Sequence, residues 1–173
     1  MRPLKPIHEP PSDADDSAQW EAIEEATELL LENDPHEALY VLKKIVQDDP
    51  KNPYAYYYIG TAMFEVGRFD AAVDAYRAAL RLSPKYLAAR VGLSHALRIE
   101  GETAAAEQQA RKALEQAPGD GDALFALGLA LASAGDRKSA VRAIRAFLDT
   151  NPELEVSLEA RAMLEKLGPV DER

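Results

Sequence analysis

The sequence contains no cysteine among its 173 residues. This absence excludes disulfides, thiolate metal sites and cysteine nucleophiles, so nothing ties the chain to an oxidising compartment. No apolar run approaches the roughly 20 residues that span a bilayer. The opening M-R-P-L-K-P-I-H-E-P-P has too many prolines for a signal peptide. We therefore expect a cytoplasmic protein without direct membrane insertion.

Groups that carry catalysis or bind metals are also scarce. No two of the three histidines have the i, i+3 or i, i+4 spacing that would let them share a metal ion. The acidic run at residues 13–16 lacks the glycine and the distal glutamate of a calcium loop. No glycine-rich phosphate loop or nucleophile turn occurs. We expect no catalytic residue, no metal and no cofactor, and hence no enzyme.

Basic residues are in the minority, and the formal net charge is −10. This charge argues against nucleic acid as a partner, because phosphate backbones are bound by clustered Lys and Arg. Residues 19–52 hold nine acidic and three basic residues, a formal charge of −6. This acidic first block either steers a basic partner or simply forms a solvated face.

A period of 34 residues organises the chain from Gln19 onward. The blocks 19–52, 53–86, 87–120 and 121–154 follow one another without insertion. Block position 32 is Pro50, Pro84, Pro118 and Pro152, and position 20 is Ala38, Ala72, Ala106 and Ala140. Position 15 is Asn33, Gly67, Gly101 and Gly135, residues that tolerate the positive φ of a tight turn between helices. The apolar positions before and after position 15 form one apolar stripe on each of two helices, and we expect these two stripes to pack against each other.

Helix punctuation agrees with these blocks. Asn52 before Pro53, and Asp34 before Pro35, each predict a capping side chain followed by proline at the first helical position. The first block departs most from the pattern, as expected of a terminal unit with solvent on one side. Other departures are Arg90 and Ser94 in the third block and Phe147 in the fourth.

The two flanks differ from the repeats. Residues 1–17 are proline-rich and acidic, so we expect a disordered tail, or else a short recognition motif. Residues 153–167 predict an amphipathic helix that caps the fourth block, followed by a second disordered tail at 168–173. The same helix could instead dock on a second copy and give a homo-oligomer.

This spacing closely resembles that of the tetratricopeptide repeat over residues 18–152. The resemblance implies an all-α fold, an α-solenoid (right-handed superhelix) of four 34-residue helix-turn-helix repeats plus a C-terminal capping helix. It also implies a non-catalytic protein whose first helices line a concave groove for a peptide or helix. The groove residues that it implies are Tyr54, Tyr57, Tyr58, Thr61, Phe64, Val91, His95, Arg98, Phe125 and Leu129.

The resemblance favours a protein-binding adaptor or scaffold, with a protein or peptide partner. The Lys, Arg and Asn residues by which some relatives clamp acidic chaperone tails are missing from the matching positions. Two alternatives remain. One is a structural subunit of a larger or self-associating assembly. The other is a secretion chaperone similar to small acidic tetratricopeptide chaperones of bacteria, which typically have three degenerate repeats. Frequent Ala and Arg also suggest a bacterial source.

Overall fold

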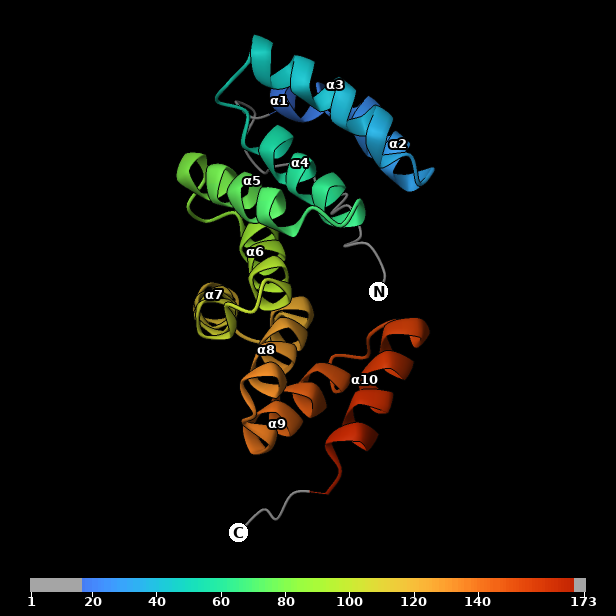
Figure 1. Ribbon diagram of the computed structural model, residues 1–173, viewed down its shortest axis with the longest axis vertical. Helices are drawn as coiled ribbons and strands as arrows, with labels where there is room; N and C mark the ends of the chain where they lie inside the picture. The colour runs from blue at the N-terminus through green and yellow to red at the C-terminus, as the bar shows by residue number, and fades with distance from the viewer. Residues whose placement is uncertain (1–16, 170–173) are drawn as a thin grey trace. The chain divides into compact units, whose positions relative to one another are not determined.

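The structure is a computed structural model that describes residues 17–169. Of the tails predicted at residues 1–17 and 168–173, residues 1–16 and 170–173 lie outside the described residues. Ser17 was expected to end the first tail, but it begins a helix. Every regular element between residues 17 and 169 is a helix, and no strand occurs there (Figure 1). The predicted all-α class is confirmed.

The helices follow the order of the sequence blocks, with three helical segments in the first block, two in each of the other three, and one helix after them. The described residues form α1 Ser17–Glu21, α2 Glu24–Leu31, α3 Pro35–Asp48, α4 Pro53–Glu65, α5 Phe69–Leu82, α6 Leu87–Ile99, α7 Thr103–Gln116, α8 Gly121–Ala134, α9 Arg137–Leu148 and α10 Leu154–Leu167. The first block alone has its first helix in two pieces, α1 and α2.

This break in the first block was not predicted from the sequence. A turn at Ala22 and Ile23 separates α1 from α2, and the amide of Ile23 donates to the carbonyl of Trp20 at 3.0 Å. Ile23 is buried, so the break places an apolar side chain in the core.

The turns between paired helices have the predicted conformation. Asn33, Gly67, Gly101 and Gly135 all adopt positive φ, between 62° and 85°. At Gly67, for example, φ is 77°, which a side chain with a Cβ rarely adopts. The positive-φ prediction for block position 15 is therefore confirmed in all four turns.

Both predicted caps are present. The Asn52 side chain accepts from the amides of Tyr54 at 3.0 Å and Ala55 at 3.1 Å, and Asp34 accepts from Glu37 at 3.1 Å. The Asn52 side-chain amide also donates to the carbonyl of Gln19 at 2.9 Å. Asn52 thus caps α4 and also ties it to α1, where it is fully buried.

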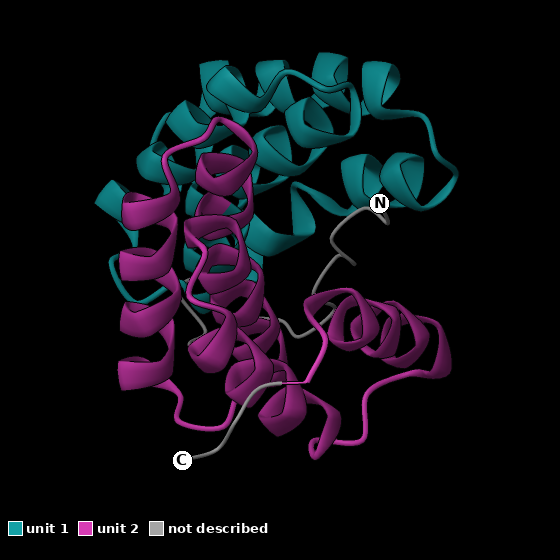
Figure 2. Cartoon of the chain, turned by 60° about the horizontal axis from the view of Figure 1, so that its bottom comes forward, with its two compact units in different colours: residues 1–92 teal, residues 93–173 magenta. Residues whose placement is uncertain are grey.

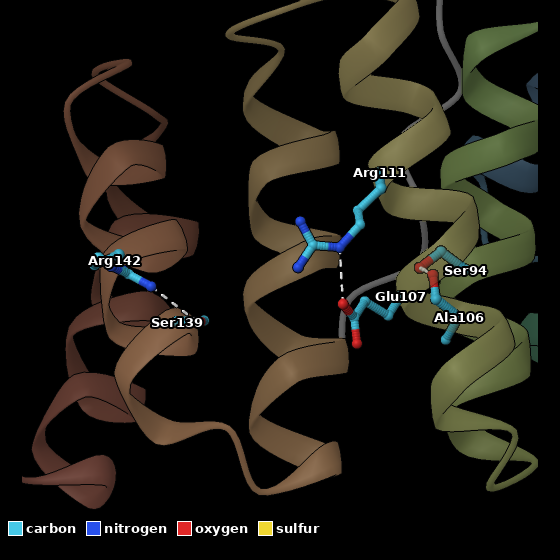
Figure 3. A network of polar contacts seen from close by, with 6 residues as sticks. All are labelled: Ser94, Ala106, Glu107, Arg111, Ser139 and Arg142. Carbon is cyan, nitrogen blue, oxygen red and sulfur yellow. Dashed lines mark hydrogen bonds and ion pairs between the residues drawn. The ribbon is translucent and has the colours of Figure 1, made fainter.

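Small residues allow close helix packing. The four alanines at block position 20 are all fully buried. In the third block, the Ser94 hydroxyl donates to the carbonyl of Ala106 at 2.8 Å, which joins α6 to α7 (Figure 3). This bond explains why a serine replaces a small apolar residue there, since its hydroxyl is satisfied within the core. On the exposed side of α7, Arg111 pairs with Glu107 at 2.7 Å (Figure 3).

The chain divides into two compact units, residues 1–92 and 93–173 (Figure 2). Within unit 1, α3 packs against α2 and α4, and α4 packs against α5. Within unit 2, α8 packs against α7 and α9, and α10 packs against α9. Arg137 at the start of α9 donates to the carbonyl of Leu167, which fastens the end of α10.

Candidate functional site

Six aromatic residues of unit 1 form a connected group, called here the aromatic cluster. Helix α4 supplies three of its tyrosines because its sequence reads Y-A-Y-Y-Y. Ring centroids are 5.4 Å apart for Trp20 and Tyr54, 5.4 Å for Tyr54 and Tyr86, and 5.0 Å for Tyr57 and Tyr86. The rings meet edge to face or tilted, the arrangements that aromatic pairs prefer. The cluster consists of Trp20, Tyr54, Tyr57, Tyr58, Tyr76 and Tyr86.

The aromatic cluster has a buried base and a partly exposed rim. Tyr57 and Tyr58 are only 1% and 0% exposed. Trp20, Tyr54 and Tyr86 are half-buried and form the rim. Burial raises the pKa of Tyr58 and Tyr86 well above the usual range, so these phenols stay neutral at physiological pH. The cluster therefore presents rigid, uncharged rings with polar tips.

Tyr76 fixes the base of the aromatic cluster. A Cβ at Gly60 would lie 2.6 Å from the Tyr76 ring, and one at Gly92 would lie 2.7 Å from it. Its hydroxyl lies 3.4 Å from the Thr61 hydroxyl, which in turn donates to the Tyr57 carbonyl at 3.3 Å. Glycines on α4 and α6 thus make room for a ring that the other blocks replace with Leu, Ala or Ile.

Three further predicted groove residues of unit 1 are also buried: Thr61, Phe64 and Val91. The Phe64 ring lies 5.1 Å from that of Phe69 at the start of α5. Glu65 was not predicted as a site residue, yet it is half-buried, and burial raises its pKa to about 7. Its Oε2 atom has no hydrogen-bond partner within the described part of the chain.

His95 and Arg98 lie one turn apart on α6 in unit 2. His95 is 7% exposed, and Arg98 is half-buried. Burial, together with the positive charge of Arg98, lowers the pKa of His95 to about 4. Burial lowers the pKa of Arg98, while Glu159 on α10 acts on it in the opposite direction. His95 is therefore neutral at pH 7 and sits beside a cation.

Phe125 and Leu129 belong to a hydrophobic cluster of unit 2. They pack with Ile144, Phe147 and Ala160, and the rings of Phe125 and Phe147 stack at 4.8 Å. Apolar side chains of α10 pack against the same cluster, among them Val156, Met163 and Leu164. The predicted capping helix thus packs against the cluster that holds two predicted groove residues.

Of the ten predicted groove residues, Tyr54 and Arg98 are half-buried and the other eight are buried. The structure brings Tyr54, Tyr57 and Tyr58 together in unit 1, and Phe125 and Leu129 together in unit 2. Contact of any of them with a partner stays a prediction. Trp20, Tyr76 and Tyr86 join the aromatic cluster although they were outside the predicted set. For Trp20 and Tyr86, aromatic character beside the starts of first helices is the signal that could have found them.

Among residues 17–169, no three His, Asp or Glu side chains are grouped so that they could hold a metal ion. Across the same described residues, no helix combines the length and the apolar character that crossing a membrane requires.

The family profile described as Tetratricopeptide repeat matches residues 23–86, 59–121 and 91–155. This chain belongs to the tetratricopeptide repeat family. A comparison with curated proteins found no match.

Solved structures of tetratricopeptide proteins share the fold. One crystal structure of MamA is 28% identical, with a TM-score of 0.69, over 80% of this chain and 81% of that one. MamA from Desulfovibrio magneticus is 22% identical, with a TM-score of 0.66, over 80% and 77%. A thermophilic tetratricopeptide protein from Thermus thermophilus is 21% identical, with a TM-score of 0.71, over 86% and 80%. The fold is an α-solenoid of helical repeats, and it supports a general role in protein interaction or scaffolding.

Proposed function

We propose that this chain is a non-catalytic adaptor or scaffold that binds a peptide or an amphipathic helix along its first helices. The observation that carries the proposal is the rim of the aromatic cluster: Trp20, Tyr54 and Tyr86 are half-buried and in ring contact. We further propose a bacterial, cytoplasmic protein, because the chain has no cysteine and its composition suggests such a source.

The rim has the properties of a binding anchor. Each of its side chains already rests against another ring, so little side-chain entropy remains to be lost on binding. The buried Tyr57 and Tyr58 support the rim from below and hold it in place. Aromatic anchors of this kind are each worth about 2 kcal/mol or more when a partner fully desolvates them.

Capture from a native lysate of the source organism tests this function. The bait carries Trp20→Ala and Tyr54→Ala on the rim, and Tyr40→Ala serves as the matched control. Tyr40 is 55% exposed on α3 and lies outside the aromatic cluster. We expect a partner that the wild type and the control retain and that the rim variant loses, at equal helicity. A partner retained equally by all three baits would contradict binding at the rim.

Self-association is the second candidate, because α10 exposes large apolar side chains. Leu154 is 76% exposed and Leu158, one turn later, is 57% exposed. Together they could form part of an interface with a second copy. Sedimentation velocity over a range of concentrations tests this, with Leu154→Ser and Leu158→Ser as the variant. Leu31→Ser on α2 is the control, since Leu31 is similarly exposed. A mass that is independent of concentration in the wild type would exclude this candidate.

A further inference from the structure

Among residues 17–169, two polar side-chain atoms of unit 2 are buried without a hydrogen-bond partner. The Nδ1 atom of His95 is buried and has no hydrogen-bond partner among residues 17–169. The Nε atom of Arg98 is likewise buried and unpartnered within that range. Buried polar groups in folded proteins are nearly always paired, so two such atoms on neighbouring side chains call for a partner that the described residues do not supply.

The two side chains lie on the same face of α6, because residues three apart in a helix are neighbours. His95 is 93% buried, whereas Arg98 is half-buried and connects the pair to the surface. A ligand group would therefore approach the pair from the side of Arg98. The hydroxyl of Ser94, which precedes His95 in the sequence, already donates to the Ala106 carbonyl and needs no hydrogen bond from a ligand.

We propose that His95 and Arg98 form a binding site for a carboxylate group carried by the protein partner. The inference rests on the proposed function and specifies the chemistry of the bound segment. A guanidinium offers only donors and carries a fixed charge, so its natural ligand is an anionic acceptor. A carboxylate has two acceptor oxygens, one for Arg98 and one for a proton on the imidazole nitrogen.

The surrounding charges are consistent with an added carboxylate. Arg98 is the charged group that acts on His95, and its positive charge opposes protonation of the imidazole. Glu159 of α10 raises the pKa of Arg98 against the larger effect of burial, so a carboxylate favours the charged form of this guanidinium. The five N–H donors of a guanidinium leave room for a second carboxylate beside the first. A bound anion would also offset the charge of Arg98 and so raise the pKa of His95.

The site differs from the clamp by which other tetratricopeptide adaptors hold acidic tails. That clamp uses Lys, Arg and Asn at block positions 2, 5, 6 and 9, whereas this site combines positions 9 and 12 of the third block. The residues at the clamp positions of that block are Ala88, Val91, Gly92 and His95.

NMR of the full chain labelled in its histidines tests the site, because the sequence has only three imidazoles. The probes are N-acetyl-leucine, which has a chain-terminal carboxylate, and N-acetyl-glutamic acid α-amide, which has a side-chain carboxylate. Their neutral controls are N-acetyl-leucinamide and N-acetyl-glutaminamide. We expect a saturable shift of the His95 signals with one or both carboxylates and with neither amide, together with a raised pKa of His95. Whichever carboxylate binds identifies a chain end or an acidic side chain as the source.

Variants assign the effect to the pair. Arg98→Gln should weaken carboxylate binding about tenfold or more, since a charge-assisted contact is lost. Arg161→Gln on α10 makes the same change of net charge at an exposed residue and should leave binding within about twofold. Glu159→Gln should tighten binding, because it removes a repelling carboxylate. Circular dichroism reports whether each variant remains folded.

Three results would overturn the proposal: no saturable response of His95 to either carboxylate, an equal response to the amides, or a response that survives Arg98→Gln. These results are independent of the lysate capture. If capture of the partner depends on the rim but the His95 signals do not respond to carboxylates, only the proposed carboxylate site is refuted. If His95 binds carboxylates but no partner is captured, the adaptor function fails and a site for small carboxylates remains.

Discussion

Replacing Gly60 with alanine probes how tightly the helices of unit 1 are packed. The new methyl group would lie 2.6 Å from Cε1 and 2.7 Å from Cδ1 of Tyr76. Carbon atoms prefer separations of about 3.5–4.0 Å, so the ring would have to move by about 1 Å. The backbone of Gly92 bounds the same ring, because a Cβ there would lie 2.7 Å from Cζ. The ring therefore has little freedom to retreat.

Two opposing terms set the size of the effect. Alanine in a helix interior is normally more favourable than glycine by about 1 kcal/mol. Overpacking a closely packed core typically costs about 1–3 kcal/mol. The confinement of Tyr76 favours the upper part of that range, so we expect a net loss of about 1–2 kcal/mol. For a chain of this length, such a loss lowers the melting temperature by about 3–6 °C.

Urea denaturation followed by circular dichroism measures this loss. Gly121→Ala at the start of α8 is the matched control, because its closest neighbour is the Thr150 hydroxyl at 3.1 Å, the end of a side chain that can rotate. The control should change stability by less than about 0.5 kcal/mol. Combining Gly60→Ala with Tyr76→Leu should cost less than the sum of the two single changes, because the smaller side chain removes the clash. A Gly60→Ala protein as stable as the wild type would refute the confinement of the ring.

Two further predictions concern unit 1. Burial raises the pKa of Glu65 from 4.5 to about 7, so its stabilising contribution is complete below pH 4.5 and is lost as the pH rises through 7. That difference corresponds to at most about 3 kcal/mol, which solvent screening of a half-exposed group reduces to about 1 kcal/mol. Glu65→Gln should therefore raise the free energy of unfolding by about 1 kcal/mol at pH 8 and leave it unchanged at pH 4, as measured by urea denaturation at both pH values. Asn52→Ala should cost about 2 kcal/mol, because it removes the cap of α4 and leaves the Gln19 carbonyl unpaired, whereas Asn52→Ser should keep the cap and cost about 1 kcal/mol less. If thermal melting showed equal losses of stability in Asn52→Ala and Asn52→Ser, the cap of α4 and the bond to the Gln19 carbonyl would not contribute separately.

The sequence predicted those features that local chemistry determines. A residue at block position 15 must reverse the chain with positive φ, and only Gly or Asn does so at low cost, as at Gly67 and Asn33. Likewise, an Asn or Asp before Pro can cap a helix through contacts that all lie within three residues, as Asn52 does. The break between α1 and α2 could not be predicted, because the identity of Ile23 does not reveal that its side chain is buried in the core.

The depth of the site residues could not be read from the pattern. Helical periodicity assigns a residue to a face of its helix, but the next helix decides how much of that face stays exposed. Tyr57 illustrates this limit, because Tyr76 and Tyr86 cover it from two other segments. Phe125 likewise lies in a cluster with Phe147 of α9 and Ala160 of α10, a helix that was expected to protect the open edge of the fourth block. The partial burial of Glu65 could not be predicted, because a single acidic residue at a helix end gives no sequence signal of burial.

We expect the acidic surface and the aromatic rim of unit 1 to act on different stages of partner binding. The carboxylates of Glu21, Glu24, Glu25, Glu28 and Glu32 are exposed, so salt screens them within about 8–10 Å. Charges of this kind mainly raise the association rate of a basic partner, whereas desolvated anchors such as Tyr54 slow its dissociation. Salt should therefore change the association rate in the wild type and in Tyr54→Ala alike, and Tyr54→Ala should change the dissociation rate at every salt concentration. If both rates responded to salt and to the substitution together, the acidic surface and the rim would have to form one continuous contact.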